Sequence, residues 1–192
     1  MVQKILTISN KDLTVQIDLH GAMLWSVLEN GGETEYLWQG DAKYWTGKAP
    51  NLFPYIARMT DKRYRLNGQE YGMNIHGFAR DNDFQVAKQT TDALMLQFQD
   101  TEETRKQYPY HFMLEIGYQL VGNRIDITYR VENKDEKEMY FGIGGHPGFN
   151  VPLEEGIKFE DYYLEFGGEC EAKRVSFSPD CFVQGEPVLY PL

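Results

Sequence analysis

The sequence predicts an all-β fold, a largely antiparallel β-sandwich. Segments in which apolar and polar residues alternate recur along the 192 residues, and this period of two is typical of strands with one buried face. Clusters of Gly, Asn and Asp separate the segments, as hairpin turns require. Long helical patterns that could connect parallel strands are missing, so neighbouring strands are expected to run antiparallel.

The strand predictions follow the alternation in chain order. The clearest segments cover residues 4–9, 13–19, 93–98 and 124–131. A hairpin is predicted over residues 64–71, because Asn67-Gly68 supplies a two-residue turn. A longer hairpin is predicted to join residues 114–120 to residues 124–131 through Gly122-Asn123.

Helix and domain signals are weaker. The best helical segment, residues 101–107, is short and polar and is stopped by Tyr108-Pro109. Alternation fades from Gly167 onward. Since no repeat, low-complexity segment or linker-like boundary occurs, residues 1–192 are predicted to form a single β domain.

Composition argues against several classes of function. A net charge of −10 disfavours nucleic acid as a partner, because phosphate binding needs clustered Lys and Arg. No segment is apolar and long enough to span a bilayer or to act as a leader, so a cytoplasmic protein without a membrane partner is expected. The two cysteines, Cys170 and Cys181, make neither a disulfide framework nor a zinc site and are predicted to be free thiols.

Two histidines in glycine-containing turns are the strongest candidates for chemistry. His76 lies in Asn-Ile-His-Gly-Phe-Ala-Arg-Asp, and His146 lies in Gly-Gly-His-Pro-Gly-Phe-Asn. Histidine exchanges protons near neutral pH, and glycine allows a backbone or ligand to approach the ring. Pro147 disfavours a helix at His146, and the constraint around this residue favours a functional role. For His76, a structural role in the turn is an equal alternative.

Three other charged or titratable side chains are weaker candidates. Arg58 could bind the hydroxyl groups of an oxygen-rich ligand through its planar fork of donors, although a surface ion pair is an equal alternative. His20 and His111 have no comparable context, so packing or surface roles are expected for both.

An aromatic group precedes Arg58 and could stack on sugar rings. Filling the core is nevertheless the favoured role, since large aromatic side chains dominate core burial. The group consists of Tyr36, Trp38, Tyr44 and Trp45.

Motifs for other site chemistries are missing. The sequence has no His-x-His, His-x-x-x-His or Cys-x-x-Cys pair, so no metal site is predicted. It also has no Gly-x-Ser-x-Gly turn for a nucleophilic serine and no glycine-rich phosphate loop followed by lysine.

Together these motifs resemble the aldose 1-epimerase (mutarotase) family, and within it the LacX-like branch. The ordered set is more specific than any single motif. The matching segments are residues 21–28, 35–41, 44–45, 50–58, 74–81 and 144–150.

The resemblance implies a fold and an activity. The fold would be the large antiparallel sandwich of galactose-mutarotase type, and the reaction would interconvert the α and β anomers of a free hexose without a cofactor. His146 matches the family's general acid, which protonates the sugar ring oxygen. His76 matches the second histidine of the site, which binds the sugar near that oxygen, and Arg58 matches the arginine that binds its hydroxyl groups.

One departure from the family concerns the general base. The family uses a glutamate near its C-terminus in a Glu-Pro-Trp-like context, and residues 1–192 are expected to correspond to the N-terminal two-thirds of the family fold. Glu186-Pro187 is followed by Val188 and comes too soon after His146 to fill this role. A substrate-binding aspartate of the distal part is expected to be missing as well.

The departure leaves two alternatives open. One is a non-catalytic carbohydrate-binding relative or an inactive fragment. The other, less favoured because of the acidic composition, is a hexose-6-phosphate epimerase that would use Arg63, Arg65 and Arg80. A sandwich without its distal strands would also expose sheet edges, and such edges favour self-association.

Overall fold

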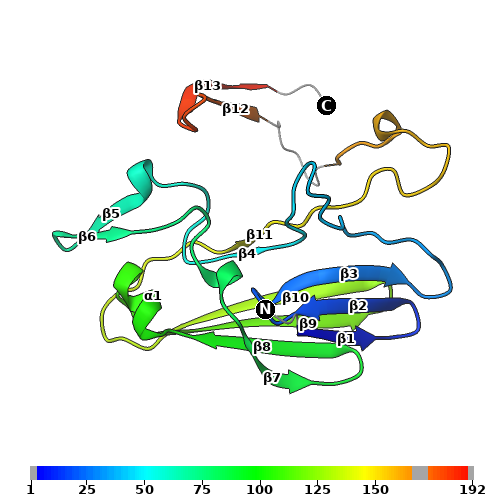
Figure 1. The fold of residues 1–192 in the computed structure, drawn as a ribbon, viewed down its shortest axis with the longest axis horizontal. Helices are drawn as coiled ribbons and strands as arrows, with labels where there is room; N and C mark the ends of the chain where they lie inside the picture. Colours follow the sequence, from blue (N-terminus) through cyan, green and yellow to red (C-terminus); the bar gives the residue numbers. More distant parts are fainter. Residues whose placement is uncertain (1–3, 166–172, 190–192) are drawn as a thin grey trace. The chain divides into compact units, whose positions relative to one another are not determined.

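The chain forms a predominantly β structure, shown in Figure 1 as a computed structural model that describes residues 4–165 and 173–189. It divides into two compact units, Met1–Leu153 and Glu154–Leu192. The first unit carries two antiparallel sheets, and the second carries a hairpin.

The first sheet has three strands in the order β1-β2-β3. Its strands are β1 (Ile5–Ser9), β2 (Leu13–Asp18) and β3 (Met23–Glu29). Along β2 the apolar residues Leu13, Val15 and Ile17 are buried, while Thr14 and Gln16 are partly exposed. This alternation is the period-two pattern from which the strand was predicted.

The second sheet has four strands in the order β10-β9-β8-β7. Its strands are β7 (Gln85–Gln89), β8 (Ala93–Gln99), β9 (Phe112–Val121) and β10 (Arg124–Asn133). Figure 1 shows the two sheets lying against each other. Ile8 and Ile17 of the first sheet share one core with Leu96, Leu114 and Ile116 of the second, which makes this unit a β-sandwich.

Two short ribbons and one helix complete the first unit. β4 (Asn51–Leu52) pairs with β11 (Gly144–Gly145), and β5 (Arg63–Leu66) forms a hairpin with β6 (Gln69–Gly72). Helix α1 (Glu102–Gln107) is capped at its N-terminus by Thr101, whose hydroxyl accepts a hydrogen bond from the Thr104 N–H at 3.1 Å. The 3₁₀ turn η1 (Thr60–Lys62) directly precedes β5, and the 3₁₀ turn η2 (Ala79–Asp81) forms the end of the His76 motif.

The second unit contains the 3₁₀ turn η3 (Phe159–Asp161) and a hairpin of β12 (Lys173–Phe177) with β13 (Val183–Leu189). This hairpin was not predicted, because its residues lack clear alternation. Cys181 lies in the hairpin's connection as an exposed free thiol, as expected, whereas Cys170 lies outside the described residues.

The other strand predictions agree closely with the structure. The predicted hairpins correspond to β5–β6 and β9–β10, and the predicted helix corresponds to α1. Strand β4 ends two residues before Pro54, which has no N–H to donate to a sheet. Within the described ranges, no helix is long and apolar enough to cross a membrane.

Candidate functional site

The β4–β11 ribbon holds the backbone at His146. The His146 N–H donates to the Pro50 carbonyl at 3.0 Å, and the Gly148 N–H donates to the Lys48 carbonyl at 2.8 Å. These bonds extend the pairing of β11 with β4, so the turn that carries His146 is fixed on both sides of the ring.

The glycine after His76 is required by a close backbone approach. Gly77 has φ of +71°, and a Cβ added there would lie 2.2 Å from the carbonyl oxygen of Phe53. The same oxygen accepts hydrogen bonds from the N–H groups of Phe78 and Ala79, at 2.9 and 3.1 Å. The His76 motif is therefore bound to the chain immediately after β4.

His76 is locked to Ala57 by two reciprocal hydrogen bonds. The His76 N–H donates to the Ala57 carbonyl at 2.9 Å, and the Ala57 N–H donates to His76 Nδ1 at 3.0 Å. Both residues have left-handed backbones, with φ of +67° at His76 and +75° at Ala57. Such non-glycine conformations cost about 1–3 kcal/mol each and concentrate at functional sites. Because Nδ1 accepts, the proton of the neutral ring resides on Nε2.

The two candidate histidines lie together. Their ring centroids are 5.6 Å apart. The His146 ring also contacts the indole of Trp45, with ring centroids 5.3 Å apart. The His146 ring is exposed and has no side-chain hydrogen bond within the described ranges. Its nitrogens are therefore open to a ligand, in contrast to Nδ1 of His76.

Burial and neighbouring charge lower the pKa of His76 below its ordinary value. Desolvation is the largest cause, followed by the positive charges of Arg80 and His146. His76 is consequently neutral at pH 7 and presents its Nε2–H as a hydrogen-bond donor. The two histidines thus differ: one is a fixed neutral donor, and the other is a free ring.

Arg80 is a site residue whose relation to His76 sequence reasoning missed. Its Nε is buried and has no hydrogen-bond partner in the described part of the chain, and the nearest carboxylate oxygen, on Asp81, is 3.7 Å away. It follows His76 by four positions in the same motif. This spacing from His76 was the only signal in the sequence for Arg80, because the burial of its Nε depends on residues distant in sequence.

Arg58 adjoins the site through the backbone. It follows Ala57, the partner of His76, and its side chain is exposed. Within residues 4–165 and 173–189, its guanidinium makes no ion pair or side-chain hydrogen bond, so the predicted surface ion pair is not formed. The structure therefore brings His76 and His146 into contact and leaves the Arg58 guanidinium without a side-chain partner in the described residues.

A buried polar cluster supports the ribbon from below. Asn51 of β4 donates through Nδ2 to the carbonyls of Gly21 and Ala22, at 3.0 and 2.8 Å, and accepts from the Tyr129 hydroxyl at 2.7 Å. A Cβ at Gly145 would lie 3.2 Å from that hydroxyl. Asn51 therefore ties the His146 turn to both sheets. Burial of the Tyr129 hydroxyl raises the pKa of Tyr129.

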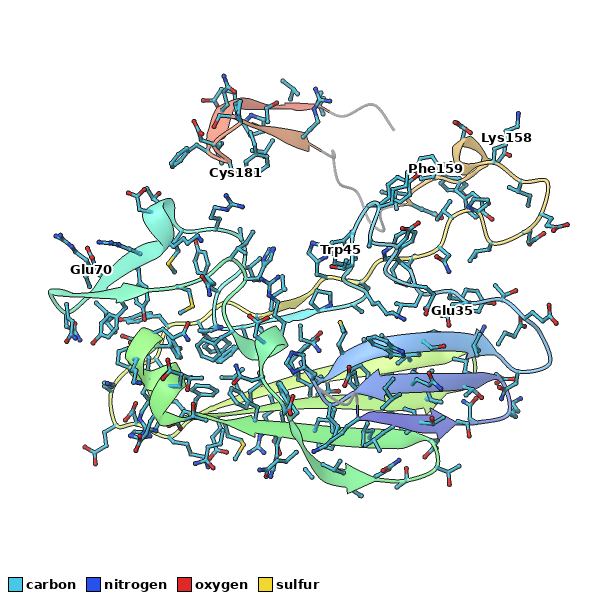
Figure 2. The ribbon with its side chains drawn as sticks, viewed as in Figure 1. Glu35, Trp45, Glu70, Lys158, Phe159 and Cys181 are labelled. Carbon is cyan, nitrogen blue, oxygen red and sulfur yellow. The ribbon has the colours of Figure 1, made fainter. Side chains whose placement is uncertain are left out.

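The aromatic group before Arg58 is only partly buried, so its predicted core-filling role was wrong for two members. Tyr44 is 70% exposed and Trp45 is 36% exposed, whereas Tyr36 and Trp38 are half-buried. Figure 2 shows Trp45 on the loop beside the β4–β11 ribbon. Of the two exposed members, Trp45 contacts the His146 ring, whereas Tyr44 contacts Trp38.

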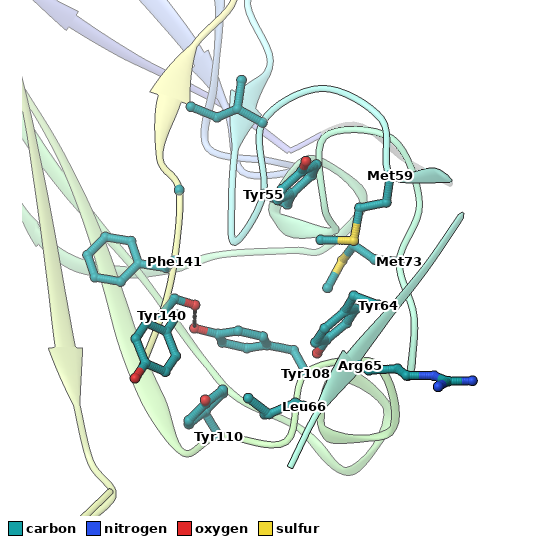
Figure 3. Close-up of a pocket in the computed structure, with 12 residues that line it drawn as sticks. Tyr55, Met59, Tyr64, Arg65, Leu66, Met73, Tyr108, Tyr110, Tyr140 and Phe141 are labelled. Carbon is teal, nitrogen blue, oxygen red and sulfur yellow. Dashed lines mark hydrogen bonds between the residues drawn. The ribbon is translucent and has the colours of Figure 1, made fainter. Parts of the chain in front are cut away.

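A separate cavity of about 510 Å³ lies beside the β5–β6 hairpin and is lined mainly by aromatic and apolar side chains (Figure 3). Neither histidine lines it. The Tyr108 hydroxyl donates to the Tyr140 carbonyl and the Tyr64 hydroxyl donates to the Gln107 carbonyl, both at 2.8 Å. These hydroxyls are used by the backbone, so the cavity offers mainly ring faces. Of the residues weighed from the sequence, Arg65 lines it, whereas His76, His146 and Arg58 do not.

The described residues contain no group of three His, Cys, Asp or Glu side chains that could hold a metal ion. At the histidine pair the described residues offer imidazole and indole groups.

Comparison with known proteins gives a consistent family relationship. The model of the aldose 1-epimerase family matches residues 4–184. The chromosomal LacX protein of Lactococcus lactis subsp. lactis is 37% identical over 165 residues, which are 83% of this chain and 55% of that protein. The chain thus spans about half the length of the curated relatives it matches.

Solved structures agree with this relationship. A galactose mutarotase related enzyme from Lactobacillus acidophilus aligns with a TM-score of 0.91 and 34% identity, covering 97% of this chain and 63% of that one. A galactose mutarotase-like protein from Lactobacillus casei aligns with a TM-score of 0.86 and 32% identity, covering 98% and 64%.

Proposed function

Because the chain belongs to the aldose 1-epimerase family and is LacX-like, we propose that it forms the acid and sugar-binding part of a site that interconverts the α and β anomers of a free hexose. The observation that carries this proposal is the contacting histidine pair, in which His76 is a fixed neutral donor and His146 is a free ring. Ring opening needs both a proton donor and a group that holds the sugar near it.

The proposed mechanism assigns one step to each group. Protonated His146 donates its proton to the sugar ring oxygen while a base removes the proton of the anomeric hydroxyl, and the bond from the anomeric carbon to the ring oxygen breaks. The bond between the first two carbons rotates, and closure on the other face returns both protons. His76 Nε2–H holds the sugar near its ring oxygen, and Arg58 binds hydroxyl groups.

The general base is not among the groups gathered at the histidines. Within the described residues, neither His76 nor His146 forms a hydrogen bond or ion pair with a carboxylate; the paired histidines are His20, with Asp83, and His111, with Asp100. This supports the second candidate function, a carbohydrate-binding module that does not turn over.

Polarimetry tests the proposal. With freshly dissolved α-D-galactose, we expect the chain to accelerate the approach to equilibrium rotation, and we expect His146→Ala to lose at least about 100-fold of that acceleration, the usual contribution of a general acid. His111→Ala is the matched control, because Nδ1 of His111 is hydrogen-bonded to Asp100 at 3.0 Å instead of open to a ligand. If rotation is not accelerated but galactose shifts the NMR signals of the His146 ring, the binding function replaces the catalytic one.

A phosphorylated hexose is less well supported. Arg63 donates to Glu70 at 2.8 Å and Arg65 lies 3.9 Å from the same carboxylate, so the two hairpin arginines share one acidic partner. The positive charge of Arg80 instead acts on His76, whose pKa it lowers. A free hexose is therefore the proposed substrate.

A further inference from the structure

We propose that Trp45 is the stacking wall of the sugar site, positioned by the turn that carries His146, so that an aldopyranose lays a C–H face on the indole. This inference rests on the proposed sugar-binding function. It adds Trp45 to the residues proposed to contact the sugar. Tryptophan has a large rigid face, and a pyranose ring has apolar C–H faces between its polar hydroxyl edges.

The loop that carries Trp45 is closed on itself. The Trp45 N–H donates to the Asp41 carbonyl at 2.9 Å, and the Trp45 carbonyl accepts from Nε1 of Trp38 at 2.8 Å. The Trp38 N–H in turn donates to the Gly148 carbonyl at 2.9 Å. The loop is thus joined through Trp38 to the turn that carries His146.

Two glycines make the space for the indole. A Cβ at Gly47 would lie 2.4 Å from Cζ2 of Trp45, and a Cβ at Gly148 would lie 3.0 Å from its Cζ3 and 2.9 Å from Cβ of Trp38. Real Cβ atoms do not approach this closely. The glycine that follows His146-Pro147 is therefore needed to seat the indole.

The seated indole combines two properties that do not follow from core packing. It lies 5.3 Å from the His146 ring at an interplanar angle of 56°, and it is 36% exposed. A side chain that only filled the core would be buried. A side chain with no role beyond the surface would not need two glycines packed closely against it. A rigid, part-exposed aromatic face beside a proton donor fits a bound sugar ring.

The neighbouring Tyr44 provides the matched control. It lies on the same loop and is more exposed, but its ring contacts Trp38, with centroids 6.3 Å apart. Of the two adjacent aromatic residues, only Trp45 has a ring contact with a candidate histidine in the described part of the chain.

The geometry is tested first without sugar. In ¹H–¹³C NMR spectra, Trp45→Ala should move the His146 ring signals, because the ring current of the indole is removed, and Tyr44→Ala should leave them in place. Gly148→Ala should move them as well if it folds, which the dispersion of the same spectra shows. If Gly148→Ala does not fold, Gly47→Ala tests the seat from the loop side. Unchanged His146 signals in Trp45→Ala would overturn the proposed contact.

Binding is tested with methyl α-D-galactopyranoside, which has no free anomeric hydroxyl and cannot undergo mutarotation. We expect Trp45→Ala to raise its Kd about fivefold to tenfold, the range of one aromatic contact, with Trp45→Phe in between and Tyr44→Ala unchanged. Saturation transfer to the sugar C–H protons should fall in Trp45→Ala.

The outcomes separate the two proposals. Equal Kd values for the unsubstituted chain and Trp45→Ala would overturn the stacking wall and leave the proposed isomerase function in place. Glycoside binding that depends on Trp45, without accelerated mutarotation of galactose, would support the wall and reject catalysis. Binding of neither the glycoside nor galactose would reject both.

Discussion

His76 and His146 have rings in contact, but they meet different surroundings. Nδ1 of His76 accepts a hydrogen bond from the Ala57 N–H, and the ring is partly desolvated. The side chain of His146 has only ring contacts within the described residues. Identical side chains thereby acquire separable tasks, because hydrogen bonding fixes a tautomer and burial disfavours charge.

The charge of Arg80 is expected to contribute to the low pKa of His76. Arg80→Gln removes one of the causes that lower it, so the His76 pKa should rise toward its ordinary value while remaining below it, since burial is the larger cause. NMR titration of the ring signals measures this. Arg80→Lys keeps the charge and serves as the control. An unchanged pKa in Arg80→Gln would contradict the assigned cause.

The same shift predicts a pH dependence of stability. The pKa of His76 is lowered from 6.5 in the folded chain, so the unfolded chain binds the proton first as pH falls. The contribution of His76 to the free energy of unfolding is therefore fully present above pH 6.5 and declines as pH drops below this value. In His76→Asn, which tolerates a positive φ, the Tm should fall less between pH 7 and pH 5 than in the unsubstituted chain. An equal fall in both would refute this contribution.

Gly77 is expected to be the least replaceable glycine of the histidine motifs. Gly77→Ala should lower the free energy of unfolding by about 2–4 kcal/mol, combining a left-handed backbone with a clash against the Phe53 carbonyl. Gly68→Ala is the control, because Gly68 also has a positive φ of +82° but open space around its Cα. It should cost only about 1–2 kcal/mol in urea unfolding. Similar losses would show that the close approach to Phe53 contributes little.

At the scale of elements, local order could be predicted and distant pairing could not. The hairpins β5–β6 and β9–β10 combine alternation with a turn of one glycine and one asparagine, and both lie where the pattern places them. The pairing of β4 with β11 joins two-residue strands far apart in the sequence, so no sequence pattern predicts it. That pairing positions His146, which explains why the sequence identified the histidines but missed Asn51 and the Arg80–His76 relation.

Asn51 is expected to be the polar residue on which the ribbon depends most. Asn51→Leu leaves the Tyr129 hydroxyl and the Gly21 carbonyl without their present partner, whereas the Ala22 carbonyl keeps the hydrogen bond from the Tyr118 hydroxyl at 2.6 Å. Each buried group left unpaired costs about 1–3 kcal/mol, so a loss of about 3–5 kcal/mol is expected in chemical unfolding. Tyr129→Phe removes one of these bonds and should cost about 1 kcal/mol. A smaller loss in Asn51→Leu than in Tyr129→Phe would contradict the shared network.

At the scale of the molecule, the chain is compact in two units and covers about half the length of its curated relatives. Within the described ranges, β10 pairs only with β9, so one side of a strand of ten residues presents unpaired backbone groups. Exposed Val121 and Ile127 lie at or near this edge. Long unpaired edges with apolar side chains favour pairing with another chain.

Self-association through β10 is therefore expected, with a second copy of the chain as the partner. The apparent mass in sedimentation equilibrium should rise with concentration, and Ile127→Lys should reduce that rise, because a charge at the edge opposes strand pairing. Val86→Lys on β7 is the matched control, since β7 is the opposite edge of the same sheet and has only five residues. Ile127 and Val86 are similarly exposed, at 41% and 43%, so a difference between the variants reports on the edge and not on burial. A chain that stays monomeric at all concentrations and melts in one sharp transition would contradict the expectation, and an equal effect of both substitutions would assign association to general surface charge instead of β10.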